Sequence, residues 1–148
     1  MDRYREDVSV GERLPPLTKH PDRVQLFRFS AATWNAHRIH YDVDYARDVE
    51  GYPDVLVQSH LHGAFLLETV LRWAGPRARV LSFGWRNEKV AVPGDVLDCT
   101  AEVTAVAVDG RIDIAVEERN QDGEVCAPGS VALWLPSRDD ERRGANYG

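Results

Sequence analysis

One stretch of this chain, residues 59 to 74, sets the strongest limit on how the rest can fold. A helical pattern runs from Ser59 to Trp73 or Ala74, and Gly75-Pro76 stops it. Its apolar side chains cover most of the circumference instead of one stripe: Leu61, Ala64, Phe65, Leu67, Val70, Leu71 and Ala74. A helix that is apolar nearly all round must be buried, so the remainder of the chain has to enclose it.

The second half of the chain contains β-prone runs that can form this enclosure. The run Arg79 to Arg86 follows the helix, and Pro93-Gly94-Asp95 then forms a turn. Three longer β-prone runs come next: Val96 to Val108, Arg111 to Arg119 and Val125 to Trp134. Asp109-Gly110 and Gln121-Asp122-Gly123 join them, and Asp-Gly between strand patterns is the strongest short hairpin signal. We therefore predict a β-meander of long strands in a strongly curved sheet.

The first part of the chain has weaker patterns. Residues 1 to 22 contain three prolines and no sustained period, which predicts an extended lead-in that wraps the domain. The run Arg23 to Phe29 is β-prone and is predicted to be a strand. It ends at Ser30, which can cap a short helix through Ala31 and Ala32.

An antiparallel meander buries a single apolar helix most economically by wrapping around it. We therefore predict an α+β protein of hot-dog architecture, with a curved antiparallel sheet around one long central helix. A chain of 148 residues suits one such domain. We place it at residues 1–136, followed by a flexible charged tail at residues 137–148. A single curled sheet leaves open edges that dimerisation would cover, so a homodimer is expected, with a higher oligomer or a heterodimer as alternatives.

The composition limits the kinds of partner that the protein is expected to bind and the cellular compartment in which it is expected to work. A net charge of -6, without a dense basic block, argues against a nucleic-acid partner. No apolar run approaches the roughly 18 to 20 residues of a membrane span, and the N-terminal residues lack the apolar core of a secretory signal. We expect a soluble, cytoplasmic protein without a membrane partner, in which Cys99 and Cys126 are buried and reduced.

Polar and ionisable side chains concentrate between Thr33 and Asp42. These ten residues hold two of the five histidines, two aromatic residues, an Arg, an Asn and an Asp. By the prediction above, the cluster begins where a strand gives way to a short helix and loop. Asp42 or Asp44 can cap a second short helix, Tyr45 to Val49. Such a cluster is typical of a functional site.

Several segments carry a resemblance to a known family: Phe29-Ser30-Ala31-Ala32-Thr33-Trp34-Asn35-Ala36-His37-Arg38-Ile39-His40-Tyr41-Asp42, Tyr45-Ala46, Glu50-Gly51-Tyr52-Pro53 and Val92-Pro93-Gly94-Asp95. They resemble MaoC-like hot-dog hydratases, and most closely the type 2 hydroxyacyl-thioester dehydratases and mesaconyl-CoA hydratase-like proteins. The resemblance covers roughly residues 23 to 135. It implies a hydro-lyase that interconverts 2-enoyl and 3-hydroxyacyl thioesters of CoA or an acyl carrier protein, in fatty acid or polyketide metabolism.

The family pattern also implies particular residues. The wider family has a catalytic Asp five residues before a catalytic His, and these positions fall on Asn35 and His40. The carboxylate is therefore missing here, although Asn with a following His-x-x-His resembles the closer branch. The family usually has His-Gly before the long helix, with the Gly N–H as oxyanion donor, and these positions are Gln58 and Ser59. The dipeptide His62-Gly63 stands four residues too late.

Hydration of a 2-enoyl thioester needs a base for the water, a proton for Cα and donors for the thioester oxygen. An imidazole has an unperturbed pKa of about 6.5 and can take and return a proton near neutral pH. We predict that His40 is this general acid/base and that the Asn35 amide holds the water. Backbone N–H groups at a helix N-terminus suit the oxyanion, and the Ser59 N–H is the candidate donor.

Other residues are assigned supporting roles. We predict that His37, Asp42 and Gln58 orient the site, and that Arg38 and Arg86 contact the phosphates of CoA or a carrier arm. The alternatives are a loop capped by its own polar side chains, a helix cap at Asp42, and solvated arginines. No residue spacing supports a metal site, and no cofactor is expected beyond the CoA or phosphopantetheine of the substrate.

Two rival functions remain open. One is a hot-dog thioesterase or biosynthetic tailoring enzyme, which the departures at Asn35 and Gln58-Ser59 suggest. The other is a non-catalytic acyl-thioester-binding subunit whose active partner supplies the missing groups. The fold alone does not choose among these functions.

Overall fold

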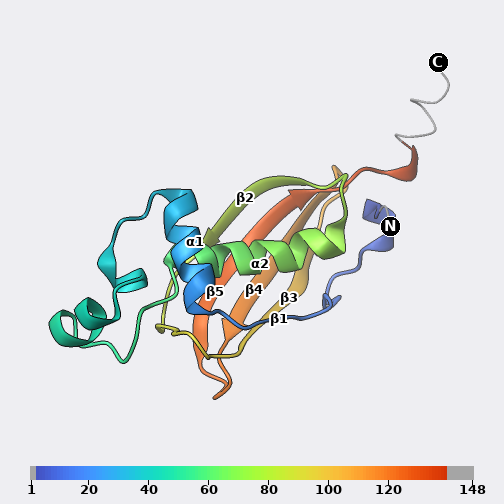
Figure 1. The fold of residues 1–148 in the computed structure, drawn as a ribbon. Coiled ribbons are helices and arrows are strands. Elements are labelled where there is room, and N and C mark those ends of the chain that lie inside the picture. The colour runs from blue at the N-terminus through green and yellow to red at the C-terminus, as the bar shows by residue number, and fades with distance from the viewer. Residues whose placement is uncertain (1–2, 140–148) are drawn as a thin grey trace.

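The computed structural model describes residues 3–139, and one antiparallel sheet organises them. Its strands follow the order β1-β3-β4-β5-β2. They are β1 (Leu17–Lys19), β2 (Arg79–Trp85), β3 (Leu97–Val106), β4 (Arg111–Arg119) and β5 (Val125–Trp134). The sheet curves around the long helix α2 (Ser59–Ala74), which lies along its concave face (Figure 1). The predicted α+β architecture, a curved antiparallel sheet around one central helix, is confirmed.

The meander of β3, β4 and β5 also forms as predicted. Ala101 pairs with Val116, and Val116 pairs with Gly129, so the three strands run side by side. The first hairpin turns at Gly110, where φ is 94° and a Cβ would meet the Trp134 indole. Glycine is therefore required there both for the left-handed backbone and for the close approach.

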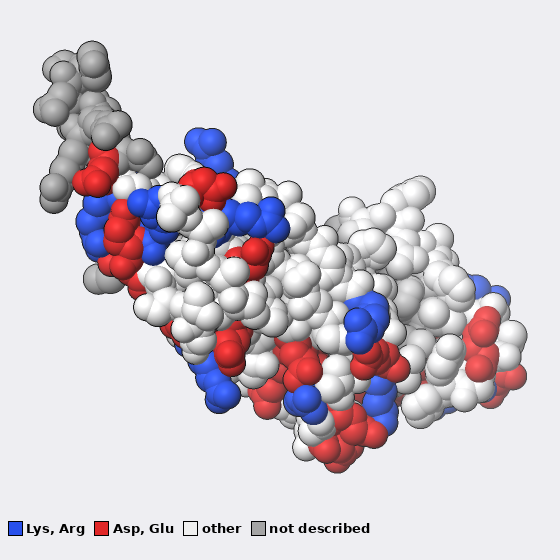
Figure 2. All heavy atoms as spheres, turned by 180° about the vertical axis from the view of Figure 1, so that it is seen from behind, with Lys and Arg blue, Asp and Glu red and all other residues white. Residues whose placement is uncertain are grey.

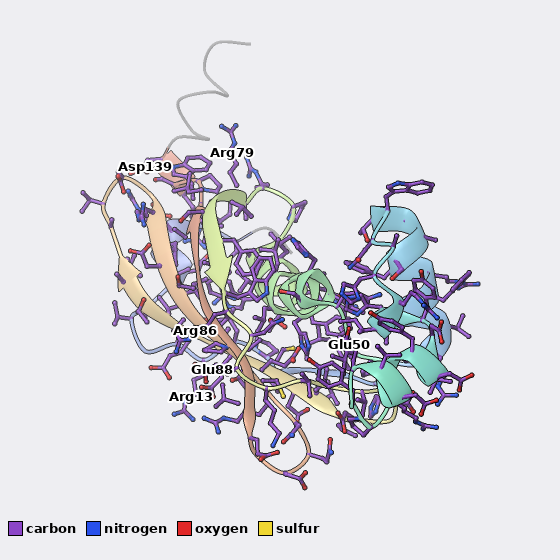
Figure 3. All side chains as sticks on the ribbon, turned by 90° about the vertical axis from the view of Figure 1, so that its left-hand side faces the viewer. Arg13, Glu50, Arg79, Arg86, Glu88 and Asp139 are labelled. Carbon is purple, nitrogen blue, oxygen red and sulfur yellow. The ribbon has the colours of Figure 1, made fainter. Side chains whose placement is uncertain are left out.

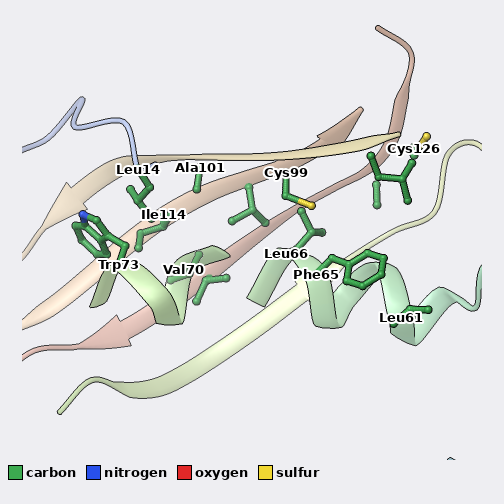
Figure 4. Close-up of a cluster of buried hydrophobic side chains, with 14 of the residues drawn as sticks. Leu14, Leu61, Phe65, Leu66, Val70, Trp73, Cys99, Ala101, Ile114 and Cys126 are labelled. Atoms are coloured by element: carbon green, nitrogen blue, oxygen red, sulfur yellow. The ribbon is translucent and has the colours of Figure 1, made fainter. Parts of the chain in front are cut away.

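The core lies between α2 and the concave face of the sheet (Figure 4). Helix residues spaced three or four apart face the strands, and Leu66 and Val70 are fully buried. The opposite face of α2 is open, with His60, Ala64 and Leu71 exposed. The prediction that α2 is buried nearly all round is therefore wrong for this face, because one sheet covers only one side of a helix.

The strand predicted at residues 23–29 is wrong. These residues begin a helix, α1 (Arg23–Thr33), which lies across the start of α2 (Figure 1). Asp22 caps it, because its Oδ1 accepts a hydrogen bond from the Gln25 N–H at 2.7 Å. The physical reason for the error is that the apolar residues of this run do not form the stripe typical of a surface helix.

Two buried residues of α1 hold this helix against the start of α2. Leu26 and Ser30 are spaced i, i+4 and face Gln58 at the start of α2. Ser30 is therefore inside the helix and does not cap a new one, which corrects the short helix predicted there. The polar cluster consequently begins where a helix ends, and not where a strand ends.

The lead-in wraps the domain as predicted. It contains a short 3₁₀ helix, η1 (Arg5–Asp7), and the strand β1, which the proline-rich pattern did not reveal. β1 pairs with β3 through Leu17 and Cys99. The Trp73 indole N–H donates to Glu12 at 2.9 Å, which ties the lead-in to the end of α2.

The C-terminal tail predicted at residues 137–148 falls mostly on residues 140–148, which lie outside the described part. Ser137 is buried, and its hydroxyl donates to Glu6 at 2.7 Å. Both cysteines, Cys99 and Cys126, are buried with free thiols, as predicted. Within residues 3–139, none of the helices combines the length and apolar character needed to cross a membrane.

Candidate active site

The polar cluster forms a lobe beside the N-terminal end of α2 (Figure 1). After α1 the chain makes a 3₁₀ helix, η2 (Arg38–His40), and a short π-helix, η3 (Tyr45–Val49), before it returns to α2. The second short helix was therefore predicted correctly. Asp42 caps it, because its Oδ1 accepts the Tyr45 N–H at 3.1 Å. Seen from behind, much of this lobe is free of charged side chains except at its outer rim (Figure 2).

His40 is the buried imidazole of this lobe, with 9% of its surface exposed. Its Nδ1 lies 2.8 Å from the Leu56 carbonyl oxygen, which can only accept a hydrogen bond. Nδ1 therefore carries the proton in the neutral ring, and Nε2 has a free lone pair. Burial lowers the pKa of His40, and the nearby His37 lowers it further, while the hydrogen bond to Leu56 opposes both. The ring is consequently neutral at pH 7 and can act as a base.

Asn35 and His37 make local hydrogen bonds instead of contacting the His40 ring directly. The Asn35 Oδ1 accepts the His37 N–H at 3.2 Å, and the His37 Nδ1 accepts the Ile39 N–H at 3.3 Å. The rings of His37 and His40 meet edge to face with 6.0 Å between their centroids. Asn35 and His40 share no hydrogen bond among those found in residues 3–139. The Asn35 amide nitrogen is thus left for other partners.

Arg38 of η2 pairs with Asp42, two residues beyond the end of that helix. The Arg38 guanidinium donates to Asp42 at 2.8 Å and lies over the Tyr45 ring, 4.3 Å from its centroid. The Tyr45 N–H and then Arg38 lower the pKa of Asp42, and Asp42 raises the pKa of Arg38. Asp42 therefore serves as a helix cap and an arginine partner, and its hydrogen bonds include none to a histidine.

The start of α2 is tied to two other elements. Gln58 is fully buried, and its Nε2 donates to Leu26 O at 2.7 Å and to Ser30 Oγ at 2.9 Å. The Trp85 indole N–H, from β2, donates to the Ser59 carbonyl at 3.1 Å. The hydrogen bonds found in the described residues include none from the backbone N–H groups of Ser59 and His60. The N-terminus of α2 thus presents free donors on a fixed turn.

The dipeptide His62-Gly63 lies inside α2, away from these donors. His62 is buried against Glu118 of β4, and its Nδ1–H donates to that carboxylate. Gly63 lies so close to Trp85 that a Cβ would be 2.7 Å from the ring. The dipeptide is therefore part of the helix packing, and Gln58-Ser59 is the pair at the start of the helix.

Arg86 lies apart from the lobe. It pairs with Glu88 at 2.6 Å and is largely exposed. Figure 3 shows it on the sheet side of α2, whereas Glu50 marks the lobe on the other side. The structure therefore does not bring Arg86 together with Arg38, although both were predicted to contact substrate phosphates.

An apolar hollow of about 190 Å³ opens beside Asn35. Three aromatic residues line it, and all three are exposed: Phe27 at 61%, Trp34 at 90% and Tyr41 at 43%. Trp34 ends α1 in the left-handed conformation, with φ at 56°. That conformation is uncommon for a bulky residue. The hollow thus offers an apolar surface next to Asn35.

No group of three or more His, Cys, Asp or Glu side chains within residues 3–139 is arranged to hold a metal ion. His37 and His40 are instead occupied by backbone partners on their Nδ1 atoms.

Comparison with known proteins identifies the family. Residues 9–93 match the family model of hydroxyacyl-thioester dehydratase type 2. This chain belongs to that family. The beta subunit of 3-oxo-4,17-pregnadiene-20-carboxyl-CoA hydratase from Mycobacterium tuberculosis is 32% identical over 115 residues, which cover 78% of this chain and 88% of that protein.

A second relative and a solved structure are also similar to this chain. Mesaconyl-C(4)-CoA hydratase from Chloroflexus aurantiacus is 51% identical over 61 residues, 37% of this chain but only 22% of that protein's length. The unliganded R-hydratase PhaJ1 from Pseudomonas aeruginosa superposes with a TM-score of 0.84 at 21% identity, covering 91% of this chain and 86% of that one. The latter confirms the hot-dog fold, and the family is one of hydratases and dehydratases, which are hydro-lyases.

Several residues that shape the site had no signal in the sequence. Leu56 contributes a backbone carbonyl, which any residue could supply. Trp85 and Glu118 reach α2 from strands distant in the chain, and an isolated Trp or Glu in a strand pattern indicates no partner. Only the tertiary contacts identify these three residues.

Proposed function

We propose that this chain is a hydratase/dehydratase that interconverts 2-enoyl and 3-hydroxyacyl thioesters of CoA or an acyl carrier protein, with His40 as general acid/base. The main support for the proposal is that His40 is held in one tautomer and that its pKa is lowered. Its Nδ1–H is held by the Leu56 carbonyl, and burial lowers the pKa of the ring. An unprotonated Nε2 at neutral pH is the form that a general base requires.

In the hydration direction, Nε2 of His40 removes a proton from water while the hydroxyl oxygen adds to Cβ of the enoyl thioester. The electron pair of the double bond moves toward the thioester oxygen, and an enolate forms. The free Ser59 N–H and the positive end of α2 stabilise this charge, a contribution of about 3 to 4 kcal/mol for one preorganised donor. The imidazolium then returns its proton to Cα, so the ring ends as it began.

The other residues act around this step. Asn35 has its Oδ1 engaged by the His37 N–H, so its Nδ2–H groups hold the oxygen of the attacking water. Gln58 keeps the first turn of α2 against α1, and His37 and Asp42 hold the loop that carries His40. Arg38, on the exposed side of η2, meets the phosphates of the substrate arm.

We also propose that the working unit contains two such domains. β2 lies at an edge of the sheet, and Val80 and Leu81 on it are exposed together with Leu71 of α2. Pairing of two copies at this edge would cover these side chains and the outer edge of β2, which pairs with β5 on its other side. Light scattering on the purified protein measures this directly, and a monomer at micromolar concentration would refute it.

The function is tested by following loss of the enoyl-thioester absorbance with purified protein and a series of enoyl-CoA substrates. His40→Ala should reduce kcat by at least about 10²-fold, the lower range for a general acid/base. Asn35→Asp should retain or raise activity, because a carboxylate both holds and polarises the water. His20→Ala, an exposed histidine outside the lobe, is the matched control and should be unchanged. Full activity of the His40 variant would refute the role of His40.

A second function has one observation in its favour. The Mycobacterium tuberculosis relative is a beta subunit, and this chain lacks the carboxylate at Asn35. A non-catalytic acyl-thioester-binding subunit would bind acyl-CoA tightly in calorimetry without turnover, and turnover would appear only after an active partner is added.

A further inference from the structure

A pair of ionisable side chains lies in the core below the first turn of α2. His62 and Glu118 are 1% and 0% exposed. The His62 Nδ1–H donates to one carboxylate oxygen, and the Cys99 thiol lies 3.7 Å from the other. Burial and the adjacent Glu118 raise the pKa of Cys99, so this thiol remains a hydrogen-bond donor. Both oxygens of Glu118 therefore have partners inside the buried layer between α2 and the sheet.

Stability alone does not account for such a pair. Moving two ionisable groups out of water carries a large desolvation penalty, and apolar side chains of similar volume in the same place are often as stabilising or more so. Leu66 and Val70, the neighbours of His62 along the buried face of α2, show that this layer accepts aliphatic residues. A hydrogen bond differs from apolar packing in being directional, because it fixes both a distance and an orientation.

The His62–Glu118 pair orients the helical turn that carries the candidate oxyanion donors, the N–H groups of Ser59 and His60. The His62 N–H bonds to the Gln58 carbonyl at 3.1 Å, which closes the turn that begins at Ser59. Glu118 belongs to β4, the central strand of the sheet. Gln58 ties the same turn to α1, and Trp85 ties it to the edge strand β2. The His62–Glu118 hydrogen bond links this turn to β4 at the centre of the sheet.

We propose that His62 and Glu118 are positioning residues, which fix the rotation of α2 over β4 so that the Ser59 and His60 N–H groups face the thioester oxygen. The role in catalysis rests on the proposed function. A displacement of about 1 Å at such donors can reduce a rate about 10²-fold. The pair touches no reacting atom, and its effect passes through the first turn of the helix.

The decisive variant replaces both partners, His62→Leu together with Glu118→Leu, so that neither ionisable group is left without the other. We expect this double variant to keep its urea midpoint near that of the wild type but to lose kcat by at least about 10-fold, with KM changed less than about threefold. Glu68→Gln is the matched control, because it weakens a different polar contact of α2 with the sheet, the bond to Lys19 of β1, farther along the helix. It should leave kcat unchanged.

Amide hydrogen exchange gives a readout that does not depend on turnover. In the double variant, the bonded amides of residues 61–64 should exchange at least about 10-fold faster, while those of residues 66–74 in the same helix stay protected. Equal kcat and equal exchange in the double variant would overturn the proposal. Faster exchange along the whole helix would also overturn it, because the pair would then serve stability only.

A conservative variant covers the case in which the double variant does not fold. His62→Gln keeps a donor toward Glu118, so kcat and the exchange of residues 61–64 should stay within about threefold of wild type. A loss of at least about 10-fold in kcat in this variant would refute the role of this hydrogen bond. Failure of the wild type to hydrate any enoyl-CoA would refute the proposed function instead, and the exchange comparison would still decide whether the pair fixes the turn.

Discussion

Replacement of Gly63 by alanine tests how tightly the start of α2 is packed. An ideal Cβ on Gly63 would lie 2.7 Å from Cζ2 and 2.8 Å from Cε2 of Trp85. The ring must move back by roughly 0.7 Å to restore an ordinary van der Waals contact. This indole also donates to the Ser59 carbonyl, so the shift strains that hydrogen bond as well.

The expected change in stability comes from opposing effects. Alanine is favoured over glycine in a helix by about 1 kcal/mol, overpacking costs about 1 to 3 kcal/mol, and the lost hydrogen bond costs about 1 kcal/mol. The net expectation is that Gly63→Ala lowers the free energy of unfolding by about 2 kcal/mol, or about 4 to 8 °C in Tm for a domain of this size. Helix propensity alone predicts the opposite sign.

The assay is urea unfolding followed by far-ultraviolet circular dichroism, at matched protein concentration. The control is the same substitution in a Trp85→Leu background, where the obstacle is absent and Gly63→Ala should stabilise by about 1 kcal/mol. If Gly63→Ala is neutral or stabilising in the wild-type background, the close packing of Trp85 on α2 is refuted. A destabilisation that persists with Leu at position 85 would place the cause elsewhere.

Two further predictions concern the lobe. Because burial lowers the pKa of His40 below its ordinary value of 6.5, the unfolded chain takes up a proton before the folded protein does as the pH falls. The free energy of unfolding should therefore decrease from pH 7 toward pH 5, and urea titrations of His40→Gln should show a smaller decrease. Trp34→Asn should stabilise the protein by about 0.5 to 1 kcal/mol, because Asn tolerates the left-handed conformation that Trp34 adopts while 90% exposed. A lower Tm for this variant would refute the cost assigned to the left-handed conformation of Trp34.

Local patterns in the sequence were sufficient for the elements that carry strong periodicity or turn signals. The helix at residues 59–74 and the hairpin at Asp109-Gly110 depend on interactions between near neighbours, and both form as predicted. Helix α1 was missed because it buries only Leu26 and Ser30. Its conformation depends on Gln58, which lies on another segment, so no periodicity within residues 23–33 could reveal it.

The candidate site also combines features set by the local sequence with features set only by tertiary contacts. The sequence by itself determined that His40 and Asn35 share one loop and that Ser59 begins the buried helix, because motif spacing and helix ends are local properties. Only the tertiary structure decided which ring nitrogen of His40 carries the proton, through the acceptor at the Leu56 carbonyl, and which residue His62 contacts, namely Glu118. These contacts join residues far apart in the chain, and they exist only where the packed sheet and helix bring the two segments together.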